Sequence, residues 1–164
     1  MPGLIGEYEC TLDPKGRVKL PSVLMKQVTE LELGSVTMPE GVEGKVQKLI
    51  ITRGLEKCLD IYPVSQWEII SKKVSSVNTF IKKNRDFVRL FMSGTNELNI
   101  DITDRILIPK LLLEYAGIKK DVVMLSLGNK VEVWDKAAYQ KAIEMNADDF
   151  AGLAEEVMGG TPNE

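Results

Sequence analysis

Two ten-residue strings of the chain repeat one arrangement of an Asp, an Arg and a Pro. LDPKGRVKLP occupies residues 12–21, and IDITDRILIP occupies residues 100–109. In each string three residues separate the Asp from the Arg, three more separate the Arg from the Pro, and the copies lie 88 positions apart. The apolar positions also match, in the pairs Leu12 and Ile100, Val18 and Ile106, and Leu20 and Ile108. A repeat of this kind predicts a chain built from two copies of one structural unit.

A second pair of matching strings lies further along each copy. ITRGLEKCLDIYPVSQW resembles LSLGNKVEVWDKAAY, with Ile61–Tyr62 in the place of Val133–Trp134. The separation between the copies is 72 positions there, so the first copy carries an insertion, which we expect within residues 29–45. We therefore predict four parts, which are a first unit (6–67), connecting helices (68–94), a second unit (95–139) and a C-terminal helix and tail (140–164).

Each copy begins with the pattern of a strand, a tight turn, a returning strand and a helix. Residues 7–12 alternate polar and apolar side chains, which is typical of a half-buried strand. Residues 13–16 predict a tight turn, because Pro14 presets its own φ and Gly16 can adopt a positive φ. Residues 18–20 predict the returning strand, and Pro21 suits the first turn of a helix, where a missing N–H costs little. In the second copy the helix is expected from Pro109, and Gly117 ends it.

Both copies continue with two more strands and a helix. Residues 49–63 and 122–134 each predict a strand–turn–strand segment, and Ser65 and Asp135 are the expected N-caps of the helices that follow. The predicted fold class is therefore α+β, with flanking helices around two small β units.

Helices with apolar stripes lie outside these β units. Residues 78–94 predict a helix, with Phe80, Ile81, Phe87, Val88 and Phe91 on its apolar side and Lys82, Lys83, Arg85 and Arg89 on its polar side. A short acidic helix follows near the C-terminus, with Phe150, Leu153, Ala154 and Val157 at helical spacing. The chain's own core and a second copy of the chain are both explanations for such stripes.

The composition argues against most kinds of catalytic and metal site. The chain has no His, so the commonest general base and metal ligand is missing, and Cys10 and Cys58 alone argue against structural zinc. No Gly-rich phosphate loop or nucleophile elbow appears. No apolar run is long enough for a membrane span. We therefore expect a protein that is not an enzyme, with no cofactor, no metal and no membrane partner.

Several of these strings, in their order and spacing, resemble the MraZ family of bacterial transcriptional regulators. They are LDPKGRVKLP, TRGLEKCLDIYP, RDFVRLFMSG, DRILIPKLLLEYAGI and VEVWD. The resemblance implies two AbrB-like swapped-hairpin β units per chain and a ring-shaped homo-oligomer in the cytoplasm, associated with the nucleoid. It also implies binding of double-stranded DNA at promoter repeats upstream of the family's own operon, in the cell-division and cell-wall gene cluster.

The resemblance places the two Asp-x-x-x-Arg loops on the face that meets DNA. The DNA-binding candidates are Lys15, Arg17, Lys19 and Arg105. Arg can contact a guanine O6 and N7 together, and Lys reaches phosphate oxygens as a point charge. Asp13, Gly16 and Asp101 are expected to shape the loops and orient the Arg side chains.

The second loop departs from the family pattern, because Asp104 stands where Gly is usual. Asp104 adds a negative charge beside Arg105, although Asp tolerates a positive φ better than most residues. Arg105 is therefore either a DNA contact or a structural ion-pair partner. Arg85 and Arg89 are candidates for contacts with the DNA backbone, and a solvated face, local pairing or an interface between protomers would also explain them.

The net charge of −3 leaves other functions open. An AbrB-type antitoxin or similar protein-binding module would share the hairpins, and a ring scaffold without DNA binding or an unrecognised enzyme are further alternatives. For a DNA-binding protein, the distribution of charge matters more than its sum.

Overall fold

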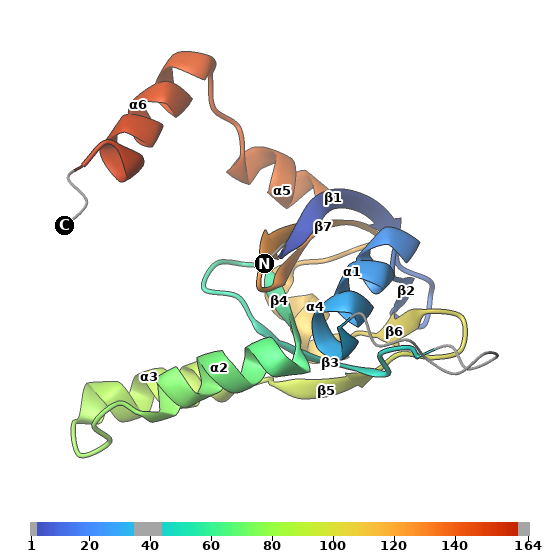
Figure 1. Cartoon of the computed structure of the whole chain (residues 1–164). Coiled ribbons are helices and arrows are strands. Elements are labelled where there is room, and N and C mark those ends of the chain that lie inside the picture. The colour runs from blue at the N-terminus through green and yellow to red at the C-terminus, as the bar shows by residue number, and fades with distance from the viewer. Residues whose placement is uncertain (1–2, 35–43, 161–164) are drawn as a thin grey trace.

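The computed structural model describes residues 3–34 and 44–160 (Figure 1). Most of the predicted insertion, residues 35–43, lies outside the described residues. Within these ranges the strands are β1 (Leu4–Thr11), β2 (Arg17–Lys19), β3 (Lys48–Arg53), β4 (Leu59–Pro63), β5 (Asn96–Asn99), β6 (Arg105–Leu107), β7 (Asp121–Gly128) and β8 (Val131–Asp135). The six helices of this part are α1 (Ser22–Leu33), α2 (Val64–Ser75), α3 (Lys82–Met92), α4 (Lys110–Ala116), α5 (Lys136–Ala142) and α6 (Ala147–Met158). The predicted α+β class is confirmed.

The strands of the two copies are interleaved in space. One sheet has the order β1-β7-β8-β4-β3-β5, with every neighbouring pair antiparallel, and β2 and β6 form a separate two-stranded ribbon. Within each copy the predicted hairpins β3–β4 and β7–β8 are present. By contrast, β1 pairs with β7 rather than with β2, and β5 pairs with β3 rather than with β6. Each copy therefore completes the sheet of the other.

One hydrophobic core joins the two copies. It contains residues from both ribbon strands, Val18 and Ile106, which are 1% and 0% exposed. Leu24 and Val28 of α1 and Leu112 of α4 pack into the same core. Because the ribbon's inner side chains are part of this core, the ribbon and the loops beside it are fixed to the sheet.

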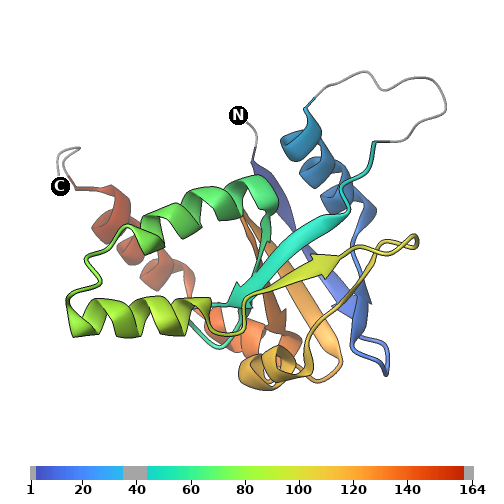
Figure 2. The same ribbon diagram turned by 90° about the horizontal axis from the view of Figure 1, so that it is seen from below.

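The helices α2 and α3 form an arm that projects from the sheet (Figures 1 and 2). Trp67 of α2 stacks on Phe91 of α3 with ring centroids 5.9 Å apart, and Phe87 stacks on Phe91 at 5.8 Å. The predicted helix over residues 78–94 is wrong at its start, because α3 begins at Lys82 and Phe80 is 95% exposed before it. Backbone bonds among residues 78–85 turn the chain there instead of extending the helix.

Helix ends agree with the predictions at some positions only. Asp135 caps α5 by accepting a hydrogen bond from the Ala138 N–H, and Gly117 ends α4 with a left-handed conformation. Ser65 is not an N-cap, because α2 begins at Val64 with Pro63 as its N-cap, so Ser65 lies inside the first turn. The Ser65 hydroxyl instead donates to Glu32 of α1, so a long-range contact replaces the expected local one.

The α6 helix lies apart from the sheet and from the arm (Figure 1). Every residue from Lys141 to Gly160 is exposed, including Phe150, Leu153 and Val157. The chain's own core therefore does not explain this apolar stripe. Within the described ranges, no helix combines the length and the apolar character needed to cross a membrane.

Candidate nucleic-acid interface

The ribbon of β2 and β6 brings the two repeated strings together. Its antiparallel register places Arg17 opposite Leu107, Val18 opposite Ile106, and Lys19 opposite Arg105. Side chains directly opposite each other point to the same side of a sheet, and neighbours along a strand alternate. Because Val18 and Ile106 point into the core, Arg17, Lys19 and Arg105 lie together on the outer face.

The first loop is held by the carboxylate of Asp13. Its Oδ1 accepts hydrogen bonds from the N–H groups of Lys15 and Arg17, both at 2.9 Å. Its Oδ2 accepts from the Arg17 Nε at 2.7 Å. Asp13 thus binds both the backbone N–H and the side chain of Arg17. Only the Nε edge of the guanidinium is used, and among the described residues no bond occupies its two Nη groups.

The second loop repeats this arrangement around Asp101. The Oδ1 of Asp101 accepts from the Arg105 N–H at 2.9 Å, and Oδ2 accepts from the Arg105 Nε at 3.2 Å. The same Nε also donates to the Thr103 hydroxyl at 2.8 Å. Arg105 is thus a structural ion-pair partner in the free protein, while its Nη groups have no bond to the described residues.

The two loops are related by an approximate two-fold symmetry through the ribbon. The Leu20 N–H donates to the Asp104 carbonyl at 2.8 Å, and the Ile108 N–H donates to the Gly16 carbonyl at 3.0 Å. Gly16 has a φ of 85° and Asp104 has a φ of 63°, so both occupy the left-handed region that favours glycine. The backbone of the second loop therefore keeps the shape of the first despite the change from Gly to Asp.

The charge of Asp104 is neutralised by a residue that sequence reasoning did not include. Lys45, which lies just before β3, forms an ion pair with the Asp104 carboxylate. Arg105 pairs with Asp101 instead of Asp104. Lys45 had no signal in the repeat, since it comes from the segment that differs between the copies.

Both loop carboxylates are stabilised in their charged form. Hydrogen bonds from the Arg17 backbone, its side chain and the Lys15 backbone lower the pKa of Asp13. Hydrogen bonds from the Arg105 backbone and from Thr103 lower the pKa of Asp101 to about 2. Each loop thus holds an ionised Asp over the whole physiological pH range.

The ribbon and its loops are basic although the chain is acidic. Together with the neighbouring Lys45, the ribbon and its loops contain five cations (Lys15, Arg17, Lys19, Lys45 and Arg105) and three carboxylates (Asp13, Asp101 and Asp104). This region therefore carries a charge of +2, against −3 for the whole chain. Lys19 and Arg105 are also directly opposite across the ribbon, and like charges in that position destabilise a sheet. A bound polyanion would relieve this repulsion.

Arg85 and Arg89 lie on the arm, away from the ribbon (Figure 1). An Nη of Arg85 donates to the Thr79 carbonyl at 2.8 Å, and an Nη of Arg89 donates to Asp86 at 3.2 Å. These two cations therefore belong to a different surface from Arg17 and Arg105, and part of their hydrogen-bonding capacity is used locally.

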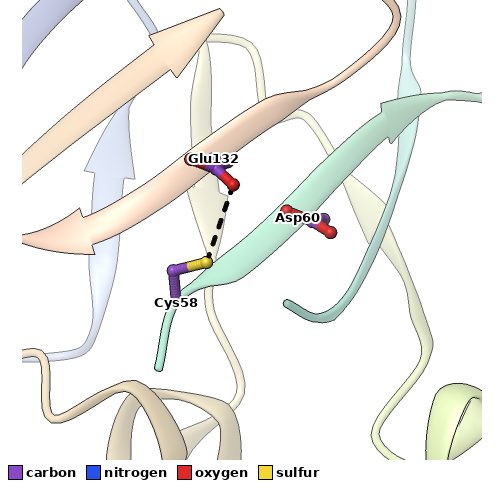
Figure 3. Close-up of side chains that lie close together, drawn as sticks. All are labelled: Cys58, Asp60 and Glu132. Atoms are coloured by element: carbon purple, nitrogen blue, oxygen red, sulfur yellow. Dashed lines mark hydrogen bonds between the residues drawn. The ribbon is translucent and has the colours of Figure 1, made fainter. Parts of the chain in front are cut away.

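A second polar cluster lies on β4 and β8 (Figure 3). Asp60 and Glu132 are opposite each other across the two strands, and the Cys58 Sγ lies 4.0 Å from a Glu132 oxygen. The three donor groups lie within 4.8 Å of one another, close enough for a cation to bridge them. The sequence alone did not bring Cys58 to these carboxylates, because strand pairing across about half the chain is needed.

This cluster already contains a cation from the protein. The Lys130 Nζ lies 3.0 Å from an oxygen of Asp60, whose side chain is 4% exposed. Burial and the nearby carboxylates raise the pKa of the Cys58 thiol to about 12, so the thiol is protonated in this arrangement. We therefore assign the cluster a structural role.

Comparison with known proteins gives the family. The chain matches the family described as "MraZ protein, putative antitoxin-like" twice, over residues 4–90 and 91–159. It is 42% identical to the Transcriptional regulator MraZ of Christiangramia forsetii over 97% of this chain and 95% of that protein. It is 41% identical to the protein of the same name from Flavobacterium psychrophilum, over 95% and 92% of the two chains, and 37% identical to that from Clostridium beijerinckii, over 93% and 95%. The chain therefore belongs to the MraZ family.

Proposed function

We propose that this chain is a sequence-specific, DNA-binding transcriptional regulator of the bacterial cell, and that the outer face of the β2–β6 ribbon reads the DNA. The observation that carries the proposal is the convergence of Arg17, Lys19 and Arg105 on one exposed face from opposite halves of the sequence. The relatives named transcriptional regulators support the functional class.

The ribbon has suitable dimensions and chemistry for a major groove. A two-stranded β-ribbon fits a groove about 12 Å wide. With Nε bound to Asp13, the two Nη groups of Arg17 form no bond to the described residues, and such a pair can donate to guanine O6 and N7 together. Lys15 and Lys19 are exposed and suit phosphate oxygens.

One ribbon per chain provides only a small contact, so we propose that several chains bind together in a ring. A closed assembly repeats the same basic face, and linked binding sites raise the overall affinity without new kinds of contact. The target is then a set of short repeats upstream of the protein's own operon. The protein acts in the cytoplasm, at the nucleoid.

A footprint of the protein on the DNA upstream of its own gene tests the proposal. We expect protected repeats at regular spacing and an affinity that falls steeply with salt, because phosphate contacts release counterions. The alternative is a protein-binding module, which the antitoxin-like description of the family favours. That alternative predicts no protected repeat and no steep salt dependence, and this result would overturn the proposal.

A further inference from the structure

We propose that Leu107 is a specificity-determining residue of the DNA interface, and that it contacts the C5 methyl group of a thymine beside the base pair that Arg17 reads. The inference rests on the proposed function, and it deepens that function by naming a base that the ribbon requires next to a guanine. Leu107 is the last residue of β6 and lies directly opposite Arg17 of β2.

Leu107 is an apolar side chain on a face that is otherwise cationic. It shares the outer face of the ribbon with Arg17, Lys19 and Arg105, and it is 57% exposed. In the first copy of the repeat the corresponding residue, 88 positions earlier, is Lys19. A single exposed leucine is ordinary elsewhere on a protein surface. On this face it occupies a position from which a side chain would meet the DNA.

Repulsion between like charges does not account for a leucine at this position. Arg105 faces Lys19 across the ribbon, and a Lys at position 107 would face Arg17 in the same way. A neutral residue opposite Arg17 avoids that repulsion. Any small polar side chain would avoid it equally well and would suit an exposed position better. The apolar character of Leu107 therefore needs an apolar partner as its explanation.

The strand register holds Leu107 close to Arg17. The Ile108 N–H donates to the Gly16 carbonyl at 3.0 Å, so Gly16 and Ile108 form a hydrogen-bonded pair. Such pairs alternate with non-hydrogen-bonded pairs in an antiparallel ribbon, so Arg17 and Leu107 form a pair of the second kind, with Cα atoms about 4.5 Å apart. A Cβ atom added to Gly16 would lie 3.8 Å from the Leu107 Cδ1, so Leu107 lies against the first loop. A groove that admits the Arg17 guanidinium therefore also receives Leu107.

The major groove contains a suitable apolar partner. Neighbouring base pairs are stacked about 3.4 Å apart, so a side chain about 4.5 Å along from Arg17 meets the pair adjacent to the guanine. The groove edges of the bases present hydrogen-bond donors and acceptors, together with the C5 methyl group of thymine. Facing the donors and acceptors, Leu107 would leave them without partners, which is costly. Facing the methyl group, it buries apolar surface instead.

Replacement of thymine by uracil tests this contact, since uracil pairs with adenine in the same way and lacks only the methyl group. The probe is a duplex that contains one site from upstream of the gene, with the thymines of the site replaced one at a time. Fluorescence anisotropy measures the affinity at one salt concentration. We expect one replacement to weaken binding by the unmodified protein about fourfold, the effect of losing one buried methyl group.

Variants assign the methyl contact to Leu107. Leu107→Ser is too short and too polar to bury the methyl group, so it should bind the thymine and uracil duplexes equally. Leu107→Lys copies the residue of the first repeat and should also lose the preference, while an added phosphate contact steepens the salt dependence. The matched control is Leu90→Ser, because Leu90 is 63% exposed on the arm. It should keep the fourfold difference, as the coupling between protein and base changes only at Leu107.

Three results would overturn the inference while leaving the DNA proposal in place. The unmodified protein could bind every uracil duplex as tightly as the thymine duplex. Both Leu107 variants could keep the fourfold difference, which would assign the methyl contact to another residue. Sedimentation velocity could show that both Leu107 variants have lost their assembly, which would place Leu107 between chains. By contrast, an unmodified protein that binds none of the duplexes would overturn the DNA proposal itself and this inference with it.

Discussion

Replacement of Arg17 should separate sequence recognition from folding. Arg17→Ala removes a side chain that is one-third exposed and whose only bond to the described residues goes to Asp13 within the same loop. The neighbouring Val18 still anchors the ribbon in the core, so the melting temperature should change little. Loss of a bidentate guanine contact is worth about 1–3 kcal/mol. At about 1.4 kcal/mol per factor of ten, binding to a duplex with one site should weaken about 5- to 150-fold.

Two matched variants locate the cause of that loss. Arg17→Lys keeps the charge but cannot form the paired contact, so it should lose most of the preference for the specific site while keeping non-specific binding. Arg105→Ala should weaken binding less than Arg17→Ala, because Arg105 is bound by both Asp101 and Thr103 and lies in the loop that contains Asp104. Fluorescence anisotropy with a specific and a scrambled duplex measures the affinity of all three variants for DNA. If Arg17→Ala binds the specific duplex like the unmodified protein, with assembly intact, the first loop does not read the DNA.

The remaining predictions concern the second loop and the buried ion pair. Asp104→Gly should tighten DNA binding, because it removes a negative charge, releases Lys45 and suits a φ of 63°. Asp104→Asn also removes the charge and should tighten binding similarly. Weaker DNA binding by both variants would refute this role of the Asp104 charge. The pKa of Asp101 is lowered from 3.8 to about 2, so its stabilising contribution is complete above pH 4 and is lost as the pH falls toward 2. The difference in melting temperature between the unmodified protein and Asp101→Asn should therefore shrink over that interval, and a constant difference would contradict the assignment. Lys130→Met should destabilise the fold by about 3 kcal/mol in urea unfolding, because it leaves Asp60 buried and unpaired. Adding Asp60→Asn should recover much of that lost free energy of unfolding. A double variant no more stable than Lys130→Met would contradict the assignment of the loss to an unpaired Asp60.

The repeat predicted the loops well because their structure is local. Asp13 bonds to residues two and four positions away, as Asp101 does, so the string of residue types contains nearly the whole arrangement. The tolerance of Asp104 for a positive φ could also be anticipated from its side chain. The α+β class followed from strand and helix patterns of the same short range.

Contacts between distant segments could not be predicted in this way. The pairing of Lys45 with Asp104 joins residues that are 59 positions apart and has no counterpart in the other copy. The Ser65 hydroxyl donates to Glu32 instead of capping its helix. Cys58 contacts Glu132 only because β4 pairs with β8. A residue's type and its neighbours do not specify such partners, since they depend on how complete elements pack.

Lysine modification with and without DNA tests the central claim most directly. Acetylation by a small reagent, followed by mass spectrometry, reports how accessible each lysine is in the assembled protein. If the ribbon face meets the DNA, a duplex from upstream of the gene should slow modification of Lys15 and Lys19 strongly, while Lys72 and Lys73 of α2 should react at an unchanged rate. Protection of Lys72 and Lys73 with Lys15 and Lys19 still fully reactive would contradict the account and place the DNA on the arm.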